Sequence, residues 1–241
     1  MQGIVLKKQI VGWASLIALG LCAEATIISI NITNGDAPRQ IGASESTGVL
    51  DVTGWLNVTA DSTNIGGTAV DVTLSKAPSG LNTSRDSGVG DGTDGFLALY
   101  EGGLRDSSGA TLDDTFATLS DMTAFLASEG AVSYNVYAYY KSAGPNWDPD
   151  NVAIGLSGGS MTTVNPDGGT LSVSDAFVEA GTPESNYMVF SGLTADSTTV
   201  FFSRVSRDGL LTGLQIETVV PEPSAIALIL CGGLVLVRLR R

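Results

Sequence analysis

The sequence predicts an all-β fold, a single jelly-roll-like β-sandwich with one short helix, flanked by an N-terminal signal peptide helix and a C-terminal transmembrane helix. Three observations support this prediction. Short runs rich in β-branched and aromatic residues recur along the chain. Thirty glycines and many Ser, Thr and Asp residues supply turns between these runs. Both ends of the chain are apolar.

The N-terminal end has the pattern of a secretory signal peptide. Two lysines precede a 13-residue apolar core at residues 10–22, and Ala23-Glu24-Ala25 gives the small-x-small pattern that signal peptidase cleaves. Cleavage after Ala25 makes Thr26 the first mature residue, so residues 1–25 are assigned to the signal peptide. Lipidation at Cys22 is the alternative, disfavoured because a leucine precedes it.

Residues 26–218 are predicted to fold as one β-sandwich domain, since about 190 residues suffice for a single core. No helical patterns alternate regularly with the strands, which argues against a doubly wound α/β fold. The predicted strand-like runs, in order, are Thr26–Thr33, Ala69–Ser75, Phe96–Tyr100, Val132–Tyr140, Asn151–Leu156, Tyr187–Gly192, Thr198–Val205 and Leu210–Val219.

One segment has helical spacing. Its apolar residues recur three and four apart, Asp113 and Asp114 favour a helix start, and Gly130 favours a stop. We expect one or two helical turns packed across an end of the sandwich. The apolar residues are Leu112, Phe116, Leu119, Met122, Phe125 and Leu126.

The tyrosine-rich run has two faces. Tyr134, Val136, Ala138 and Tyr140 alternate with Tyr137 and Tyr139, so the two sets point to opposite sides of a strand. One side is expected to be more exposed than an ordinary core. Trp55 is expected in the core or on a sheet face, because large aromatic side chains dominate interior packing.

The C-terminal end, residues 219–241, has three parts in order. Pro221-Glu222-Pro223 cannot continue a helix, Ala225–Val237 is apolar, and Arg238, Arg240 and Arg241 close the chain. Thirteen helical residues rise roughly 20 Å, so spanning a bilayer needs flanking residues or local thinning. A buried C-terminal helix and a GPI signal are the alternatives, which the basic end disfavours.

These three parts in this order resemble the PEP-CTERM sorting signal of bacterial exported proteins. The resemblance implies recognition of the motif Pro221, Glu222, Pro223, followed by processing by an exosortase-like enzyme. It also implies a protein that is tethered to the inner membrane before processing and is then at the cell surface or extracellular. Signal peptidase, the exosortase-like enzyme and the membrane are therefore the expected partners.

The middle of the chain is also similar to one group of PEP-CTERM proteins. The similar pieces are an opening strand around residues 29–32, a Trp/Asn segment at 54–58, the tyrosine-rich strand at 134–140, and a late pair at 186–193 and 211–216. The sequence departs from the Asn-Trp-Asn-Asn motif that the group often shows. The resemblance implies a jelly-roll sandwich similar to galactose-binding-like domains, whose edge loops can hold a sugar or a calcium ion.

Composition excludes several classes of chemistry. The chain has no histidine, and both cysteines, Cys22 and Cys231, lie in the terminal segments. Histidine-dependent hydrolysis, disulfides and the common zinc sites are therefore excluded from the mature domain. Residues 26–223 carry seven basic and 24 acidic side chains, a formal charge of −17. Such a surface repels nucleic acid and attracts divalent cations.

Two acidic loops are candidate ligand sites. Asp86, Asp91 and Asp94 lie in a glycine-rich loop that suits Ca²⁺, although its spacing is not that of an EF-hand. Asp148 and Asp150 flank Pro149 and form a second calcium candidate, in which Trp147 could stack on a sugar ring. Ordinary solvated turns are the alternative for both loops, and no cofactor is expected otherwise.

Three function hypotheses follow. The first is a non-enzymatic surface or matrix protein associated with exopolysaccharide. The second is a carbohydrate-binding module, assisted or not by Ca²⁺. The third, a glycan-cleaving enzyme, needs two facing carboxylates, and no glutamate lies in a recognisable catalytic setting.

Overall fold

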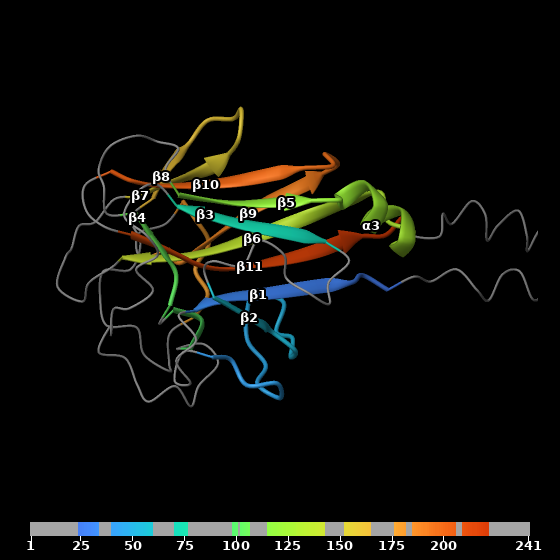
Figure 1. The fold of residues 1–241 in the computed structure, drawn as a ribbon, viewed down its shortest axis with the longest axis horizontal. Coiled ribbons are helices and arrows are strands. Elements are labelled where there is room, and N and C mark those ends of the chain that lie inside the picture. The colour runs from blue at the N-terminus through green and yellow to red at the C-terminus, as the bar shows by residue number, and fades with distance from the viewer. Residues whose placement is uncertain are drawn as a thin grey trace, which may run out of the picture.

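The computed structural model describes residues 24–33, 40–59, 70–76, 98–100, 102–106, 115–142, 152–164, 176–181, 185–205 and 209–221. They form a jelly-roll-like β-sandwich with a short helix at one end (Figure 1). The elements are β1 (Ile27–Thr33), β2 (Leu56–Thr59), β3 (Asp71–Lys76), β4 (Leu104–Asp106), β5 (Thr115–Ser120), α3 (Met122–Glu129), β6 (Ser133–Ser142), β7 (Val152–Leu156), β8 (Thr162–Val164), β9 (Tyr187–Leu193), β10 (Thr198–Arg204) and β11 (Gly209–Val219). The predicted all-β class is confirmed.

The strands form two sheets that face each other. The six-stranded sheet has the order β2-β1-β11-β6-β9, with β4 also pairing with β11. The five-stranded sheet has the order β3-β5-β10-β7-β8. All pairs are antiparallel except β1 with β2. From β2 to β7, each strand belongs to the sheet opposite that of the strand before it, which is the winding of a jelly-roll.

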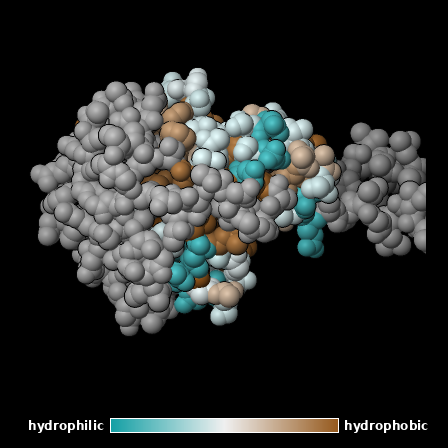
Figure 2. All heavy atoms as spheres, viewed as in Figure 1, coloured by the Kyte–Doolittle hydropathy of each residue, from teal (hydrophilic) through white to brown (hydrophobic). Residues whose placement is uncertain are grey.

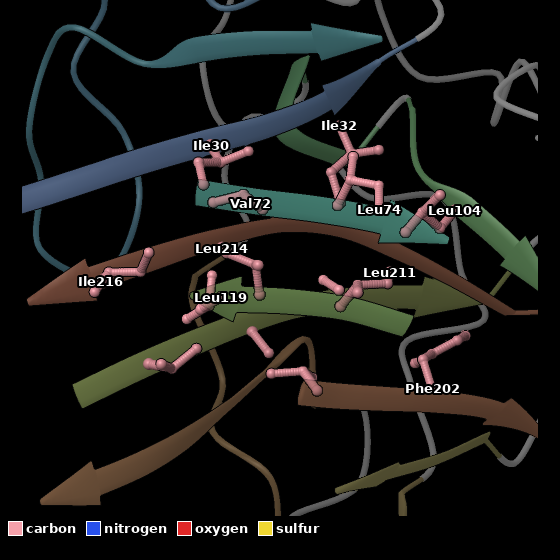
Figure 3. Close-up of a cluster of buried hydrophobic side chains, with 14 of the residues drawn as sticks. Ile30, Ile32, Val72, Leu74, Leu104, Leu119, Phe202, Leu211, Leu214 and Ile216 are labelled. Carbon is pink, nitrogen blue, oxygen red and sulfur yellow. The ribbon is translucent and has the colours of Figure 1, made fainter. Parts of the chain in front are cut away.

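The core fills the space between the sheets, because each strand turns alternate side chains inward. Ile30 and Ile32 of β1 lie across from Val72 and Leu74 of β3 in Figure 3. Leu214 and Ile216 of β11 and the buried side of β6 join the same cluster. Burial of each Val, Leu, Ile, Phe or Met side chain in this core contributes about 1.5–3 kcal/mol relative to exposure.

Helix α3 closes one end of the sandwich, as the sequence predicts. Met122, Phe125 and Leu126 face the core. The helix ends at Gly130, whose left-handed backbone (φ 65°) suits glycine. Figure 1 places α3 at the end where β1 begins and β11 ends.

The structure corrects the predicted start of this helix. Residues 115–120 form strand β5, although Phe116, Leu119 and Met122 are spaced as on a helix. In the strand, Ala117 and Leu119 point into the core, while Phe116 and Thr118 point outward. Pairing of β5 with both β3 and β10 overrides the local helical spacing.

Seven of the eight predicted strand-like runs contain a strand: β1, β3, β6, β7, β9, β10 and β11. The exception is Phe96–Tyr100, where residues 98–100 form a helical turn. Strands β2, β4 and β8 were not predicted, because three or four residues are too few to show a periodic pattern.

The two ends of the domain lie together. Ile27 of β1 pairs with Glu217 of β11, and the Thr218 N–H donates to the Thr26 carbonyl at 2.9 Å. The predicted signal peptide helix and C-terminal transmembrane helix lie outside the described residues. Within the described residues, no helix has the length and apolar character needed to cross a bilayer.

Candidate functional site

The outer face of the six-stranded sheet carries the most unusual chemistry among the described residues. In the middle of β6 and β11, its outward positions are polar or aromatic. Residues Asn135, Tyr137 and Tyr139 alternate along β6, and Gln215 and Glu217 alternate along β11. In the antiparallel register Tyr137 lies opposite Gln215, and Asn135 lies opposite Glu217. Adjacent outward side chains therefore meet across the strands.

A segment before β2, residues 40–55, covers part of this face. Hydrogen bonds within the segment hold it together. Thr47 and Val52 pair through their backbones, and the Trp55 indole Nε1 donates to the carbonyl oxygens of Thr47 (3.3 Å) and Val52 (3.1 Å). The Val49 N–H donates to the Tyr139 hydroxyl at 2.7 Å, and the Leu50 N–H donates to Gln215 Oε1 at 3.3 Å. The covering segment is thereby fixed to the sheet.

Asn57 fixes the start of the same segment. Its amide imitates a peptide group: Nδ2 donates to the Ile41 carbonyl (2.9 Å), and Oδ1 accepts from the Ile41 N–H (2.8 Å). The Asn31 amide on β1 donates to the same Oδ1 at 2.8 Å. The Trp55 and Asn57 positions of the Trp/Asn segment thus have structural roles here.

Under the covering segment lies a second core, which we call the aromatic cluster. Its buried members are Ile41, Trp55, Ala98, Leu99, Tyr100 and Tyr139, with Val49, Tyr137, Phe177 and Tyr187 packed against it. Tyr139 is its centre, since its ring centroid lies 5.6 Å from that of Phe177, 6.0 Å from Trp55, 6.2 Å from Tyr187 and 6.3 Å from Tyr100. These separations are typical of favourable aromatic pairs.

The sequence predicts that one side of this strand is more exposed than an ordinary core, and on the side of Tyr137 and Tyr139 this holds for one residue only. Tyr137 is only partly buried, whereas Tyr139 is fully buried. The reason is tertiary: the covering segment and Phe177 lie over Tyr139. The opposite side of β6, with Tyr134 and Tyr140, belongs to the main core.

Beside the covered region, four partly buried side chains form what we call the outer patch: Asn135, Tyr137, Tyr187 and Glu217. The Asn135 Nδ2 and the Tyr137 hydroxyl both donate to Glu217 Oε2, each at 2.9 Å. Among the described residues, Glu217 Oε1 has no hydrogen-bond partner. The patch thus combines two tyrosine rings with one carboxylate oxygen able to accept a further hydrogen bond.

The tyrosine pKa values follow this geometry. Burial, together with the hydrogen bond to Glu217 and the repulsion between a tyrosinate and that carboxylate, raises the pKa of Tyr137 to about 12. Burial also raises the pKa of Tyr187, with a smaller contribution from the charge of Glu179. Both phenols stay protonated at neutral pH, so they act as hydrogen-bond donors.

The sequence-predicted site residues lie mostly outside the described residues. This holds for Trp147, Asp148 and Asp150, for Asp86, Asp91 and Asp94, for Ala23, and for Glu222, Pro223, Arg238, Arg240 and Arg241. Ala25 and Pro221 are described, and both are exposed. Within the described part of the chain, no three His, Cys, Asp or Glu side chains gather in a way that could hold a metal ion.

The sequence analysis did not identify the outer patch. Strand periodicity places Asn135 and Tyr137 on the same face of their strand, but it does not say which residues of a neighbouring strand lie beside them. Glu217 joins them through the β6–β11 register, which single-sequence patterns do not reveal. The alternation of Gln215 and Glu217 within an apolar run is the one signal that marks this face.

No protein-family model matches the sequence, and no curated protein sequence is similar to it. Among solved structures, a β-glucuronidase 2 of Bacteroides uniformis is similar at 9% identity and a TM-score of 0.37, over 80% of this chain and 18% of that one. A GH26-CBM35 β-(1,4)-mannanase of Podospora anserina is similar at 15% identity and a TM-score of 0.29, over 64% and 26%. The chain spans about a fifth to a quarter of the length of these proteins, and similarity this distant carries no argument about function.

Proposed function

We propose that this chain is an exported, non-enzymatic protein whose acidic sandwich is delivered to the cell surface or the extracellular matrix, in association with exopolysaccharide. In this proposal the PEP-CTERM-like tail, with Pro221, Glu222 and Pro223, directs sorting by an exosortase-like enzyme. The signal peptide directs export and is removed after Ala25.

The placement of the domain ends supports this proposal. Every described strand lies between Ile27 and Val219, so removing either terminal segment leaves both sheets whole. The first and last strands are neighbours in one sheet, and they begin and end at the same end of the sandwich. A domain built in this way tolerates both cuts, because neither cut removes a strand or its pairing partner.

Mass spectrometry of the protein from fractionated native cells tests the proposal. We expect exported material to begin at Thr26 and to lack Arg241. A variant with Pro221→Ala and Pro223→Ala is expected to stay in the membrane fraction with its tail intact. Exported material that retains Arg241 would show that the tail is not removed.

A second function, carbohydrate binding, is favoured by the outer patch. Tyrosine rings stack on the apolar faces of sugar rings, while carboxylate and amide groups bind hydroxyls. Tyr137 and Tyr187 supply the rings, and Glu217 and Asn135 supply the polar groups. All four members of the patch are partly exposed, so a ligand can reach them.

A glycan array probed with and without Ca²⁺ separates this function from the first. If the outer patch binds glycans, Tyr137→Ala abolishes the signal, while Phe201→Ala, on the outer face of the other sheet, leaves it unchanged. Loss with Trp147→Ala instead would place binding in the 145–151 loop. The absence of any glycan signal would remove the carbohydrate-binding function.

Polysaccharide turnover tests the non-enzymatic assignment. We expect no release of reducing ends from extracellular polysaccharide. Turnover that Glu217→Gln abolishes would overturn the assignment and would make this carboxylate catalytic.

A further inference from the structure

Thr26 is tied to the domain by four hydrogen bonds at the α3 end. Its N–H donates to Thr218 Oγ1 at 2.7 Å, and its carbonyl accepts from the Thr218 N–H at 2.9 Å and from Thr218 Oγ1 at 3.4 Å. Its own hydroxyl donates to the Glu129 Oε2. The residue that would become the mature N-terminus is therefore already ordered between β11 and the last turn of α3.

Glu129 lies in an unfavourable place for a carboxylate. It is the last residue of α3, where the helix dipole presents partial negative charge, and the last turn contains no basic residue. Glu217, which pairs with Ile27 on the neighbouring strand, is also acidic, but its side chain lies on the outer face of the sheet. Its carboxylate is occupied with Asn135 and Tyr137.

We propose that Glu129 and Thr218 form a binding site for the α-ammonium group that signal peptidase creates at Thr26. This inference rests on the proposed export and cleavage after Ala25. Hydrolysis of the Ala25–Thr26 peptide bond turns the Thr26 amide N–H into a primary amine, which takes up a proton from water. The released carboxylate stays on the signal peptide.

The geometry suits such a group. The nitrogen and the hydroxyl of a threonine are three bonds apart, so the Glu129 carboxylate lies within about 6 Å of the new charge, the range over which an opposite charge stabilises an ion. An ammonium has three donors, of which one already points at Thr218 Oγ1. Cleavage thus adds a positive charge beside Glu129, to which only the neutral Thr26 hydroxyl donates before cleavage.

Cleavage by signal peptidase therefore stabilises the docked position of Thr26, the new N-terminal residue. Before cleavage the Glu129 carboxylate accepts a hydrogen bond from a neutral hydroxyl, and after cleavage a positive charge also lies within about 6 Å of it. The site is specific for one cleavage position, because only a cut that leaves Thr26 as the first residue places the ammonium beside Glu129. A cut one residue earlier or later moves the charge along the chain.

The test is the pKa of the Thr26 amino group in the protein after the signal peptide has been removed. The protein is expressed in an export-competent bacterium, and the N-terminal peptide is identified by mass spectrometry. The folded protein is acetylated with acetic anhydride at pH values from 6 to 10. The rate at which its N-terminal peptide becomes acetylated, plotted against pH, gives the pKa. An ordinary α-amino group has a pKa of about 7.7–8.0, and we expect a value about one unit higher in the folded protein. The same protein unfolded in urea gives the reference.

Glu129→Gln keeps the shape of the side chain, and we expect it to return the pKa to the urea value. Thr218→Val removes the hydroxyl acceptor and is expected to lower the pKa partly. Glu179→Gln changes an exposed glutamate elsewhere and should have no effect. Equal pKa values in the folded and urea-unfolded wild type, or no change in Glu129→Gln, would overturn the capture site alone. Absence of a peptide beginning at Thr26 would overturn both the capture site and the proposed cleavage.

Discussion

At the residue scale, Tyr139 shows how a single side chain connects layers. Its ring holds the aromatic cluster together, and its hydroxyl accepts from the Val49 N–H while donating to Gln215 Oε1. Gln215 in turn donates to Ser29 Oγ at 3.0 Å. The contacts of Gln215 with Tyr139 and Ser29 are buried and the contact of Tyr139 with Val49 is partly buried, so each of these groups depends on the others.

Tyr139→Phe should therefore destabilise the domain more than the same change at Tyr137. It leaves the Val49 N–H without its partner and removes one of the two hydrogen bonds to Gln215 Oε1, at a cost of about 1–3 kcal/mol. Tyr137→Phe removes a partly exposed hydrogen bond, at a cost of about 0.5–1.5 kcal/mol. Urea unfolding of the two variants measures the difference, and equal losses would show that the covering segment is not fixed through Tyr139.

Gly213 illustrates a second residue-scale constraint. A Cβ at this position would lie 2.7 Å from the Ile30 carbonyl oxygen and 2.7 Å from Leu99 Cδ1, at the place where β11 shifts its register against β6. Glycine is needed because the backbone of β1 and the aromatic cluster both approach closely.

Gly213→Ala is expected to lower the free energy of unfolding by about 1–3 kcal/mol, the usual cost of overpacking. Gly159→Ala is the control, because its nearest contact is the Leu156 carbonyl oxygen at 3.3 Å in an exposed turn. Thermal unfolding compares the two. A smaller loss at Gly213 than at Gly159 would contradict the close approach.

At the element scale, α3 depends on a cap from another part of the chain. Asp121 precedes the helix in a left-handed conformation and makes no side-chain cap hydrogen bond. Asp196, in the turn between β9 and β10, caps instead: its Oδ1 accepts from the Thr123 N–H at 2.9 Å, and its carbonyl accepts from the Met122 N–H at 3.1 Å. The helix and the β9–β10 turn are thus one unit.

This cap predicts a pH dependence. The Thr123 backbone hydrogen bond, with the Thr123 side chain, lowers the pKa of Asp196 below its ordinary value. A carboxyl group whose pKa is lowered by folding adds stability above its ordinary pKa of about 4, and the contribution is lost as the pH falls through the folded value. Asp196→Asn should therefore lower Tm at pH 6. The difference in Tm between wild type and this variant should become smaller near pH 2. Asp121→Asn serves as control, and a gap that stays constant with pH would contradict the cap.

At the scale of the whole molecule, the domain has two cores on the two sides of one sheet. The main core lies between the sheets, and the aromatic cluster lies on the outer face of the six-stranded sheet. The six tyrosines of the chain belong to these cores or pack against them. In Figure 2, hydrophilic side chains gather around the α3 end on the viewed side, with hydrophobic ones between them.

Alkaline titration tests this arrangement. Burial raises the pKa of Tyr100, Tyr134, Tyr137, Tyr139, Tyr140 and Tyr187, to about 12 for Tyr137 and Tyr140. Because the folded pKa values lie above the unfolded value of about 10, their contribution to stability is complete below pH 10 and is lost as the pH rises through the folded values. Tyrosinate absorbance at pH 10 should therefore be far below the half-ionised level seen in urea. Half-ionisation of the folded protein at pH 10 would contradict the buried tyrosine clusters.

The sequence by itself determined the fold class, most of the strands, the faces of β6 and the end of α3 at Gly130. These features follow from local patterns: alternation in Tyr134–Tyr140, turn residues, and a residue that tolerates a positive φ. Each is read within a few neighbouring positions. The two terminal segments and the acidic loops stay predictions.

The tertiary structure alone decided which strands are neighbours, that residues 115–120 are a strand, and that Tyr139 is buried while Tyr137 is not. It also brought Asn135 and Glu217 together, capped α3 from Asp196, and placed Thr26 beside Glu129. Each of these contacts joins residues more than 70 positions apart. Their pairing depends on strand register and on the closure of long loops, which no local pattern encodes.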